Sequence, residues 1–401
     1  MGVFKRVGVG AAVAALAVTL PAAASAANRG DWGRAELVKF AVLPAETYVP
    51  GSEPAGSLLG TAPVNGIAAP FADQPVQGFS GVLRNSDGTF DVLSDNGFGN
   101  KANSADFLLR IQRVAPDFGT GRIDVVGGLN LTDPNGRVPF PLTRPDRVLT
   151  GADFDVESIT RTADGTYWIG DEFGPYLLHF DRAGRLLDAP VPLPGVFAPE
   201  NPDRGTTPAN LNSSKGFEGM AQSPDGRFLY PLLEGTVAGD PAGALRFNEF
   251  DLTRGAYTGR RWTYQLDAPG NAIGDAIAVD RDRFLVIERD NGEGATAVTK
   301  KIYLADRRDR NRDGQLDKTL VADLMDISNP KRIGGFERRF TFPFQTIEDV
   351  VVLDDRTIAV LNDNNFPSSA GRTPGVADNN EFIVLRLDRG LDADKRILDR
   401  R

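Results

Sequence analysis

Acidic residues stand at both ends of a predicted hairpin, VESITRTADGTYWIGDEFG, which covers residues 156–174. An Asp-Gly pair supplies the positive φ angles that a two-residue primed turn requires, so Asp164 and Gly165 are expected to form the turn. This register places Glu157 opposite Glu172 across the two strands. Because like charges directly opposite each other destabilise a sheet, such a pair needs protons or a cation to offset the repulsion.

Four other segments share the pattern of a strand, a tight turn rich in Asp and Gly, a second strand and an acidic or Asn-rich exit. They are FSGVLRNSDGTFDVLSDNG from Phe79, FEGMAQSPDGRFLYPLLEG from Phe217, GDAIAVDRDRFLVIERDNG from Gly274 and IEDVVVLDDRTIAVLNDNN from Ile347. Two-residue turns predict the facing pairs Ser80–Asp95, Asp275–Glu288 and Glu348–Asp363. In the segment from Phe217, the same rule places Glu218 opposite Leu233 and leaves Glu234 beside the pair.

These five segments are the elements that must position the acids. Turn signals recur along the chain, which has 44 glycines and 27 prolines, and strand-like runs dominate between them, which predicts an all-β fold. Repeats of this length, each with about four strands, are typical of a β-propeller. We expect five blades, with six possible if residues 31–78 or the Pro-rich stretch before Val156 form a degenerate one. Pairing of a strand that begins at Ala35 with one that begins at Glu381 would close the ring.

In a propeller the first strand of each blade lines the central channel, so the acids at its start are expected to converge on one mouth. The predicted ring comprises Asp95, Glu157, Glu172, Glu218, Asp275, Glu288, Glu348 and Asp363. So many carboxylates lying close together cannot all stay ionised without protons or a cation. Ca²⁺ prefers several carboxylate and carbonyl oxygens, so it is the predicted ion, and Asn96, Asn364 and Asn365 could add neutral oxygens. The alternative is that each acid lies at a strand end in contact with water.

The first 26 residues have the pattern of a cleavable signal peptide. Lys5 and Arg6 form a basic start, residues 7–20 form an apolar run, and Ala24-Ser25-Ala26 is a small-residue cleavage site. We therefore expect an exported protein, secreted or periplasmic, with a single domain over residues 27–401. An uncleaved membrane anchor is less favoured, because the apolar run is shorter than the roughly 20 residues that span a bilayer.

Composition excludes several classes of site. The chain has no cysteine, which excludes disulfides and thiolate metal ligands, and its formal net charge of −9 argues against nucleic acid or an anionic membrane as a partner. The single histidine, His179, excludes His-based zinc sites, and no Gly-x-Ser-x-Gly elbow is present for a serine esterase. A second cation loop is possible over residues 309–317, DRNRDGQLD, although Leu320 stands where a calcium loop has its bidentate Glu.

Several of these motifs resemble those of a known family. GFEGMAQSPDG, DFDVESITRTADGTYWIGDEFGP, FLVIERDNG and IEDVV with VLNDNNFP are similar to the phytase-like domain of exported bacterial proteins, described as having esterase-like activity of the phytase family. The similarity covers most of the chain, from about Gly78 to Leu387. It implies a β-propeller, export, Ca²⁺ and hydrolysis of ester or phosphoester bonds. It also places the family's characteristic acids at Glu157, Glu172, Glu218, Glu288, Glu348 and Asp363.

The ring and the resemblance together predict a Ca²⁺-dependent hydrolase acting on a small ester or phosphoester. Ca²⁺ would polarise an acyl or phosphoryl oxygen, and a ring carboxylate, Glu157 or Glu172, would serve as the base for water. Lys215 and Arg289 are the basic residues expected to bind substrate, a small complement for a polyanion such as phytate. One alternative is a non-enzymatic secreted propeller that binds an extracellular ligand and holds structural Ca²⁺. Another is a Ca²⁺-dependent, lactonase-like propeller. Nothing in the sequence indicates an oligomeric state.

Overall fold

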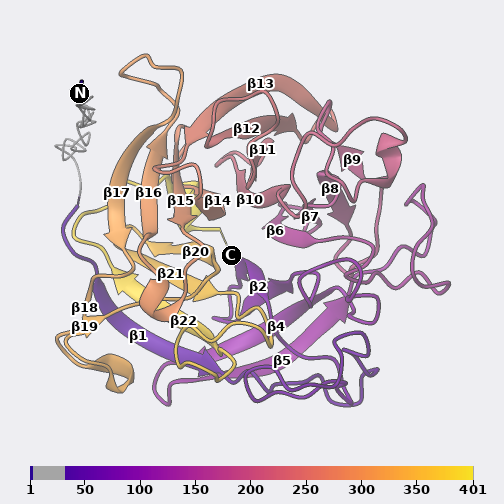
Figure 1. Ribbon diagram of the computed structural model, residues 1–401, viewed down its shortest axis with the longest axis horizontal. Helices are drawn as coiled ribbons and strands as arrows, with labels where there is room; N and C mark the ends of the chain where they lie inside the picture. Colours follow the sequence, from indigo (N-terminus) through magenta and orange to yellow (C-terminus); the bar gives the residue numbers. More distant parts are fainter. Residues whose placement is uncertain (3–31, 401) are drawn as a thin grey trace.

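The computed structural model describes residues 1–2 and 32–400, so residues 3–26 of the predicted signal segment lie outside the described part of the chain. Its sheets stand side by side around a central axis, in a propeller-like arrangement (Figure 1). Within residues 32–400, helical structure is limited to three 3-10 turns and one α-helix, α1 (Lys395–Leu398). The predicted all-β class is therefore confirmed. None of the described helices has the length and apolar character needed to cross a membrane.

Three of the sheets have four antiparallel strands each, paired in chain order. In Figure 1 the first strand of each sheet lies nearest the axis and the last lies towards the rim. The strands are β6 (Val156–Arg161), β7 (Tyr167–Asp171), β8 (Tyr176–Phe180) and β9 (Val191–Pro192); β10 (Phe217–Gln222), β11 (Phe228–Leu233), β12 (Ala244–Asp251) and β13 (Ala256–Gln265); and β14 (Ala272–Ala278), β15 (Arg283–Arg289), β16 (Lys300–Asp306) and β17 (Asp317–Asp323).

A ten-stranded sheet contains the remaining strands. They are β2 (Phe79–Arg84), β3 (Phe90–Ser94), β4 (Arg110–Asp117) and β5 (Arg122–Asn130), then β1 (Glu36–Leu43), β22 (Asn380–Arg386), β21 (Thr357–Asn362) and β20 (Ile347–Asp354), with the short strands β18 (Ile327–Ser328) and β19 (Arg339–Phe340) beside β1. β1 pairs antiparallel with β22 along its length, so an N-terminal strand lies beside a C-terminal one. By contrast, β1 and β5 share a single paired position, Val42 with Arg122.

The hairpin of β6 and β7 has a longer turn than the sequence analysis predicted. The Thr162 amide donates to the Thr166 carbonyl at 3.0 Å, so the loop has three residues. Gly165 takes the positive φ of 82° that such a loop needs at its last position, and the Asp164 carboxylate accepts the Thr166 amide. The register therefore shifts by one residue, and the predicted pairing of Glu157 with Glu172 is wrong.

A second irregularity lies at the start of all five inner strands. Each carries one extra residue relative to its partner: Ser80 in β2, Glu157 in β6, Glu218 in β10, Gly274 in β14 and Glu348 in β20. A bulge bends the strand and re-aims the side chain of the extra residue. The predicted facing pairs Ser80–Asp95 and Glu348–Asp363 are also wrong, because Ser80 and Glu348 are themselves the extra residues. The pair Asp275–Glu288 is wrong because this hairpin also has a three-residue turn, so Asp275 pairs with Ile287.

The inner strands pack closely around the axis. β2, β6, β10, β14 and β20 contact one another in this cyclic order. A Cβ on Gly219 of β10 would lie 2.6 Å from the amide nitrogen of Ala276 on β14, so this approach requires glycine. Apolar side chains such as Phe217, Leu229 and Phe250 fill the space between neighbouring sheets. The five bulges are thereby held at one end of a narrow central channel.

Candidate metal centre

Each inner hairpin presents two positions at the same end of the channel. One is the bulge residue of the inner strand, and the other is the residue that follows or ends the second strand. The bulge position holds Glu157, Glu218 and Glu348 in three sheets, with Ser80 and Gly274 in the other two. The second position holds Asp95, Glu172, Glu234 and Asp363, with Arg289 in the sheet of Gly274. The bulges thus give a cluster of seven acids and one arginine, which we call the acid cluster.

The acid cluster is buried. None of its seven carboxylic residues exceeds the 9% exposed fraction of Asp95. Burial raises the pKa of Asp95 to about 7, and the charges of Asp155 and Glu348 act in the same direction. Burial also raises the pKa of Glu157 well above its usual value, reinforced by the charges of Asp155 and Glu218. A proton or a nearby cation therefore offsets the cost of burying Asp95 and Glu157.

One group of three carboxylates has no basic partner. Single oxygens of Asp155, Glu157 and Glu172 all lie within 4.8 Å of one another. The Asp155 carboxylate accepts hydrogen bonds from the Asn96 amide at 2.7 Å and the Ser214 hydroxyl at 2.9 Å. Within residues 32–400 no lysine or arginine forms an ion pair with any of the three. Glu172 Oε1 is buried without a hydrogen-bond partner, and Lys215 and Arg289 act on Glu172 electrostatically without forming an ion pair with it.

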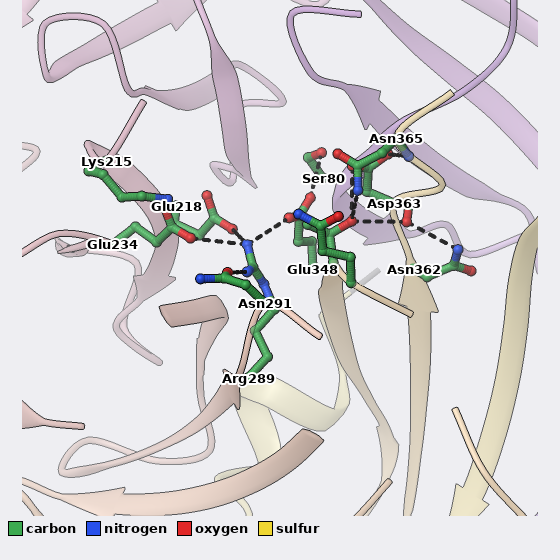
Figure 2. Close-up of polar contacts among 12 residues, drawn as sticks. Ser80, Lys215, Glu218, Glu234, Arg289, Asn291, Glu348, Asn362, Asp363 and Asn365 are labelled. Atoms are coloured by element: carbon green, nitrogen blue, oxygen red, sulfur yellow. Dashed lines mark hydrogen bonds and ion pairs between the residues drawn. The ribbon is translucent and has the colours of Figure 1, made fainter. Parts of the chain in front are cut away.

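A second group of three shares Glu172 and adds Glu218 and Glu234, again within 4.8 Å. Here the protein supplies the positive charge. Arg289 Nη2 lies 3.0 Å from Glu234 Oε1 and 3.7 Å from Glu218 Oε1, and Lys215 Nζ donates to Glu234 Oε2. Figure 2 shows the Arg289 guanidinium between these two acids and Glu348, whose Oε1 is 3.5 Å away. Both predicted basic residues, Lys215 and Arg289, thus lie at the acid cluster.

Two residues of the predicted ring lie elsewhere. The Glu288 carboxylate accepts hydrogen bonds from Lys318 Nζ at 2.6 Å, the Tyr264 hydroxyl at 3.0 Å and the Asp267 amide at 2.7 Å. Asp275 accepts the Val350 amide at 3.0 Å, which joins β14 to β20. The three-residue turn of this hairpin sets the position of Asp275, and the bulge at Gly274 shifts the next pairs, so Glu288 pairs with Ile273 and Arg289 with Ala272.

The remaining predicted acids lie in the acid cluster with local polar partners. Ser80 Oγ donates to Glu348 Oε2 at 3.0 Å. Asp363 accepts the Asn365 amide at 2.8 Å and the Thr346 hydroxyl at 3.2 Å. Asp95 accepts the Gln77 side-chain amide at 3.0 Å. These hydrogen bonds orient the carboxylates without supplying a countercharge.

Sequence reasoning left two acids of the site out of the ring. Glu234 occupies the second position of its hairpin, equivalent to Asp95, and its signal was the one-residue offset in the register of that hairpin. Asp155 lies just before β6, where its carbonyl accepts the Glu172 amide at 2.8 Å. Its amide donates to Asp171 Oδ1 at 2.9 Å. Asp155 carries no signal in the hairpin register because it precedes the paired strands.

The second cation loop forms a tight turn. Both oxygens of Asp309 accept backbone amides of the same loop, from Asp313 at 3.0 Å and Gly314 at 3.1 Å. The loop adds nothing to the two groups of three acids found among the described residues. Its acids are accounted for as turn-stabilising side chains.

Individual proteins similar to this chain are distant in sequence. An uncharacterized secreted protein of Arthroderma benhamiae is 25% identical over 63% of this chain, and the match spans 64% of that relative's length. Among solved structures, the Pseudomonas aeruginosa periplasmic gluconolactonase is 16% identical, with a TM-score of 0.35 over 87% of this chain and 99% of that one. A luciferin-regenerating enzyme is 11% identical, with a TM-score of 0.39 over 91% of this chain and 97% of that one.

A family profile matches most of the chain. Residues 74–366 match the phytase-like family, described as "Esterase-like activity of phytase". This range contains all five inner hairpins and all members of the acid cluster. The chain therefore belongs to the phytase-like family.

Proposed function

We propose that this protein is an exported, Ca²⁺-dependent hydrolase of ester or phosphoester bonds whose ion is held by Asp155, Glu157 and Glu172. The observation that carries the proposal is the difference between the two groups of acids. Glu218 and Glu234 are already offset by Arg289 and Lys215, whereas among the described residues no lysine or arginine forms an ion pair with the other group, and Lys215 and Arg289 act on its Glu172 only at longer range. A divalent cation would supply a direct countercharge.

The donors of this group fit Ca²⁺. They are carboxylate oxygens, which Ca²⁺ prefers, and the unpaired Glu172 Oε1 offers a free ligand atom. Asn96 and Ser214 hold Asp155 from the other side, as polar groups around a metal site commonly do. Because Glu172 belongs to both groups, it would link the ion to the Arg289 side of the acid cluster.

A bound Ca²⁺ would polarise the acyl or phosphoryl oxygen of a substrate. We assign proton transfer to Glu218. Its Oε1 is buried without a hydrogen-bond partner, and Arg289 lies 3.7 Å from it. Burial and the charges of Glu234 and Glu348 raise the pKa of Glu218, which places its proton exchange nearer neutral pH. Glu157 and Glu172 then act as ion ligands, and Arg289 orients Glu218.

The charge of the site favours a substrate with little negative charge. Lys215 and Arg289 are both paired with Glu234, so neither is free to hold a polyanion. We therefore propose a neutral ester or a singly phosphorylated compound over phytate. Lys215, with 38% of its side chain exposed, is the residue assigned to substrate contact.

Our proposal also includes the number of propeller blades and the export of the protein. We propose five blades, supported by the cyclic contacts of the five inner strands, with the fifth blade formed by β20, β21, β22 and β1. The pairing of β1 with β22 would then close the ring and protect its edges. Export through a cleaved signal peptide, residues 1–26, would leave residues 27–401 as one domain, in keeping with a secreted relative.

A second candidate function is a secreted binding protein in which the ion is structural. The observation that favours it is burial, since Glu157 is only 6% exposed and Glu172 only 3%. In this case Ca²⁺ would stabilise the fold and an extracellular ligand would bind elsewhere on the surface.

Turnover separates the two functions. We would assay the mature chain with p-nitrophenyl acetate, p-nitrophenyl phosphate and phytate, with Ca²⁺ and again with chelator. Wild-type protein is expected to cleave a monoester only with Ca²⁺, and Glu157→Gln to lose about 10²-fold or more of that rate. Glu46→Gln, which changes an exposed acid outside the cluster, serves as the matched control. Calcium-dependent stability without turnover of any substrate would instead establish the structural ion.

A further inference from the structure

The end of the channel away from the acid cluster contains a cavity of about 620 Å³. Its wall includes the residue three positions after the bulge in every inner strand: Leu83, Thr160, Ala221, Ile277 and Val351. Three residues of a strand span about 10 Å, so these five wall residues lie about 10 Å along the strands from the bulges. The cavity is therefore separate from the acid cluster and has a mostly apolar wall.

The wall contains one polar group without a partner. Thr160 is 6% exposed, and its Oγ1 has no hydrogen bond to any described residue. Buried hydroxyl groups are nearly always paired, with protein, water or a ligand. The Thr160 hydroxyl thus lies at the wall with its hydrogen-bonding capacity unused.

The C-terminal segment forms the floor of the cavity. Ile397 of α1 is buried, and Arg396 and Arg400 line the cavity beside it. Arg400 donates to the backbone carbonyls of Gln222 at 3.4 Å and Ser223 at 2.9 Å, and it forms no ion pair within residues 32–400. A guanidinium without a carboxylate partner remains able to bind an anion.

One charged group of the wall, Arg400, favours an anion. Of the other arginines that line the cavity, Arg161 pairs with Asp91 at 3.3 Å, Arg396 pairs with Asp394 at 2.6 Å, and Arg84 donates to the Leu353 carbonyl at 2.9 Å. Two acids, Asp225 and Asp399, also line the cavity. Asp225 is already engaged by the Ser223 hydroxyl at 2.6 Å and the Arg227 amide at 3.1 Å. The cavity therefore combines an aliphatic wall with one arginine, Arg400, that forms no ion pair with a described residue.

We propose that this cavity is a second ligand site, which takes an unbranched aliphatic carboxylate. The hydrocarbon chain would lie against Leu83, Ile277 and Val351, and the carboxylate would meet Arg400 and the Thr160 hydroxyl. The volume lies within the range of about 300 to 1,000 Å³ found for small-molecule sites. The site is independent of the ion and of the proposed hydrolysis.

Calorimetric titration of decanoate into the mature chain tests this site, with chelator present so that the acid cluster plays no part. One decanoate per chain is expected to bind. Ala221→Trp, which fills the cavity, should weaken binding at least 10-fold, and Arg400→Gln should weaken it about 3- to 10-fold. The matched control, Val126→Trp, adds the same ring at a valine that is 54% exposed and should bind as wild type.

Three results would overturn the proposal. They are the absence of decanoate binding, binding that Ala221→Trp leaves unchanged, and decanol binding as tightly as decanoate, which would remove the role of Arg400. Thermal melting reports whether Ala221→Trp is folded. If it is not, Val351→Phe fills the same level of the channel and provides the same comparison.

Discussion

Without Ca²⁺, the protein should become more stable as the pH falls from 8 to 5, and Asp95 should account for a defined part of that gain. Burial raises the pKa of Asp95 from its usual 3.8 to about 7, and the charges of Asp155 and Glu348 add to the effect. The folded state therefore binds the Asp95 proton more tightly than the unfolded state. The stabilisation that protonated Asp95 provides is complete below about pH 4 and is lost as the pH rises through 7.

The two pKa values set the magnitude. Linkage between a folded pKa of about 7 and an unfolded value of 3.8 gives about 2.6 kcal/mol of extra stability at pH 5 relative to pH 8. Asp95→Asn keeps the shape and the acceptor for the Gly97 amide, which lies 2.8 Å from Asp95 Oδ1, but it cannot titrate. The difference in unfolding free energy between pH 8 and pH 5 should therefore be about 2.6 kcal/mol smaller in Asp95→Asn than in wild type.

Urea denaturation of both proteins at the two pH values, with chelator present, measures this difference. Saturating Ca²⁺ should reduce it, because the cation favours the ionised carboxylates. The reasoning is refuted if Asp95→Asn and wild type show the same pH dependence, since Asp95 would then titrate normally in the folded protein.

Two further substitutions test the packing of the cluster. Arg289→Met should lower the free energy of unfolding by about 3 to 5 kcal/mol at pH 7.5, because it leaves buried carboxylates without their ion pair. Arg310→Met, which removes an exposed arginine from its pair with Asp306, should change the free energy of unfolding by less than about 1 kcal/mol. Equal effects of the two substitutions in urea denaturation would contradict this expectation. Gly274→Ala should cost about 3 kcal/mol, because its Cβ would lie 1.9 Å from the Ile347 carbonyl oxygen. Gly270→Ala, with open space at its Cβ, should be neutral in the same melting experiment, and a neutral Gly274→Ala would show that the bulge in β14 can relax.

The fold class could be predicted because its signals are local. Alternating apolar residues and Asp-Gly turns identify each hairpin within about 20 residues of sequence. The strand register within each hairpin was harder to predict than the fold class, because two-residue and three-residue turns have the same Asp-Gly signal. Asp164 and Gly165 fit both, and only the hydrogen bond from Thr162 to Thr166 distinguishes them.

The bulges explain the remaining differences at the site. Three of the extra residues are Glu, and the other two are Ser80 and Gly274, so residue type alone does not mark a bulge. In the hairpin of β14 and β15, the turn and the bulge each shift the pairing by one residue, which brings Arg289 into the cluster and leaves Glu288 outside it. In the hairpin of β10 and β11, the bulge alone shifts the pairing, beside Glu234. The prediction that acids gather at one end of the channel nevertheless locates the site, because it depends on strand order more than on exact register.

Calcium binding tests the central claim most directly, namely that the acid cluster holds a divalent cation. We would titrate Ca²⁺ by calorimetry into the mature chain after removal of metals, using wild type, Glu157→Gln, Glu172→Gln and the exposed control Glu46→Gln. We expect wild type and Glu46→Gln to bind Ca²⁺ alike and each cluster variant to bind at least 10-fold more weakly. A cation site in the acid cluster is contradicted if wild type binds no Ca²⁺, or if Glu157→Gln and Glu172→Gln bind it as tightly as wild type does.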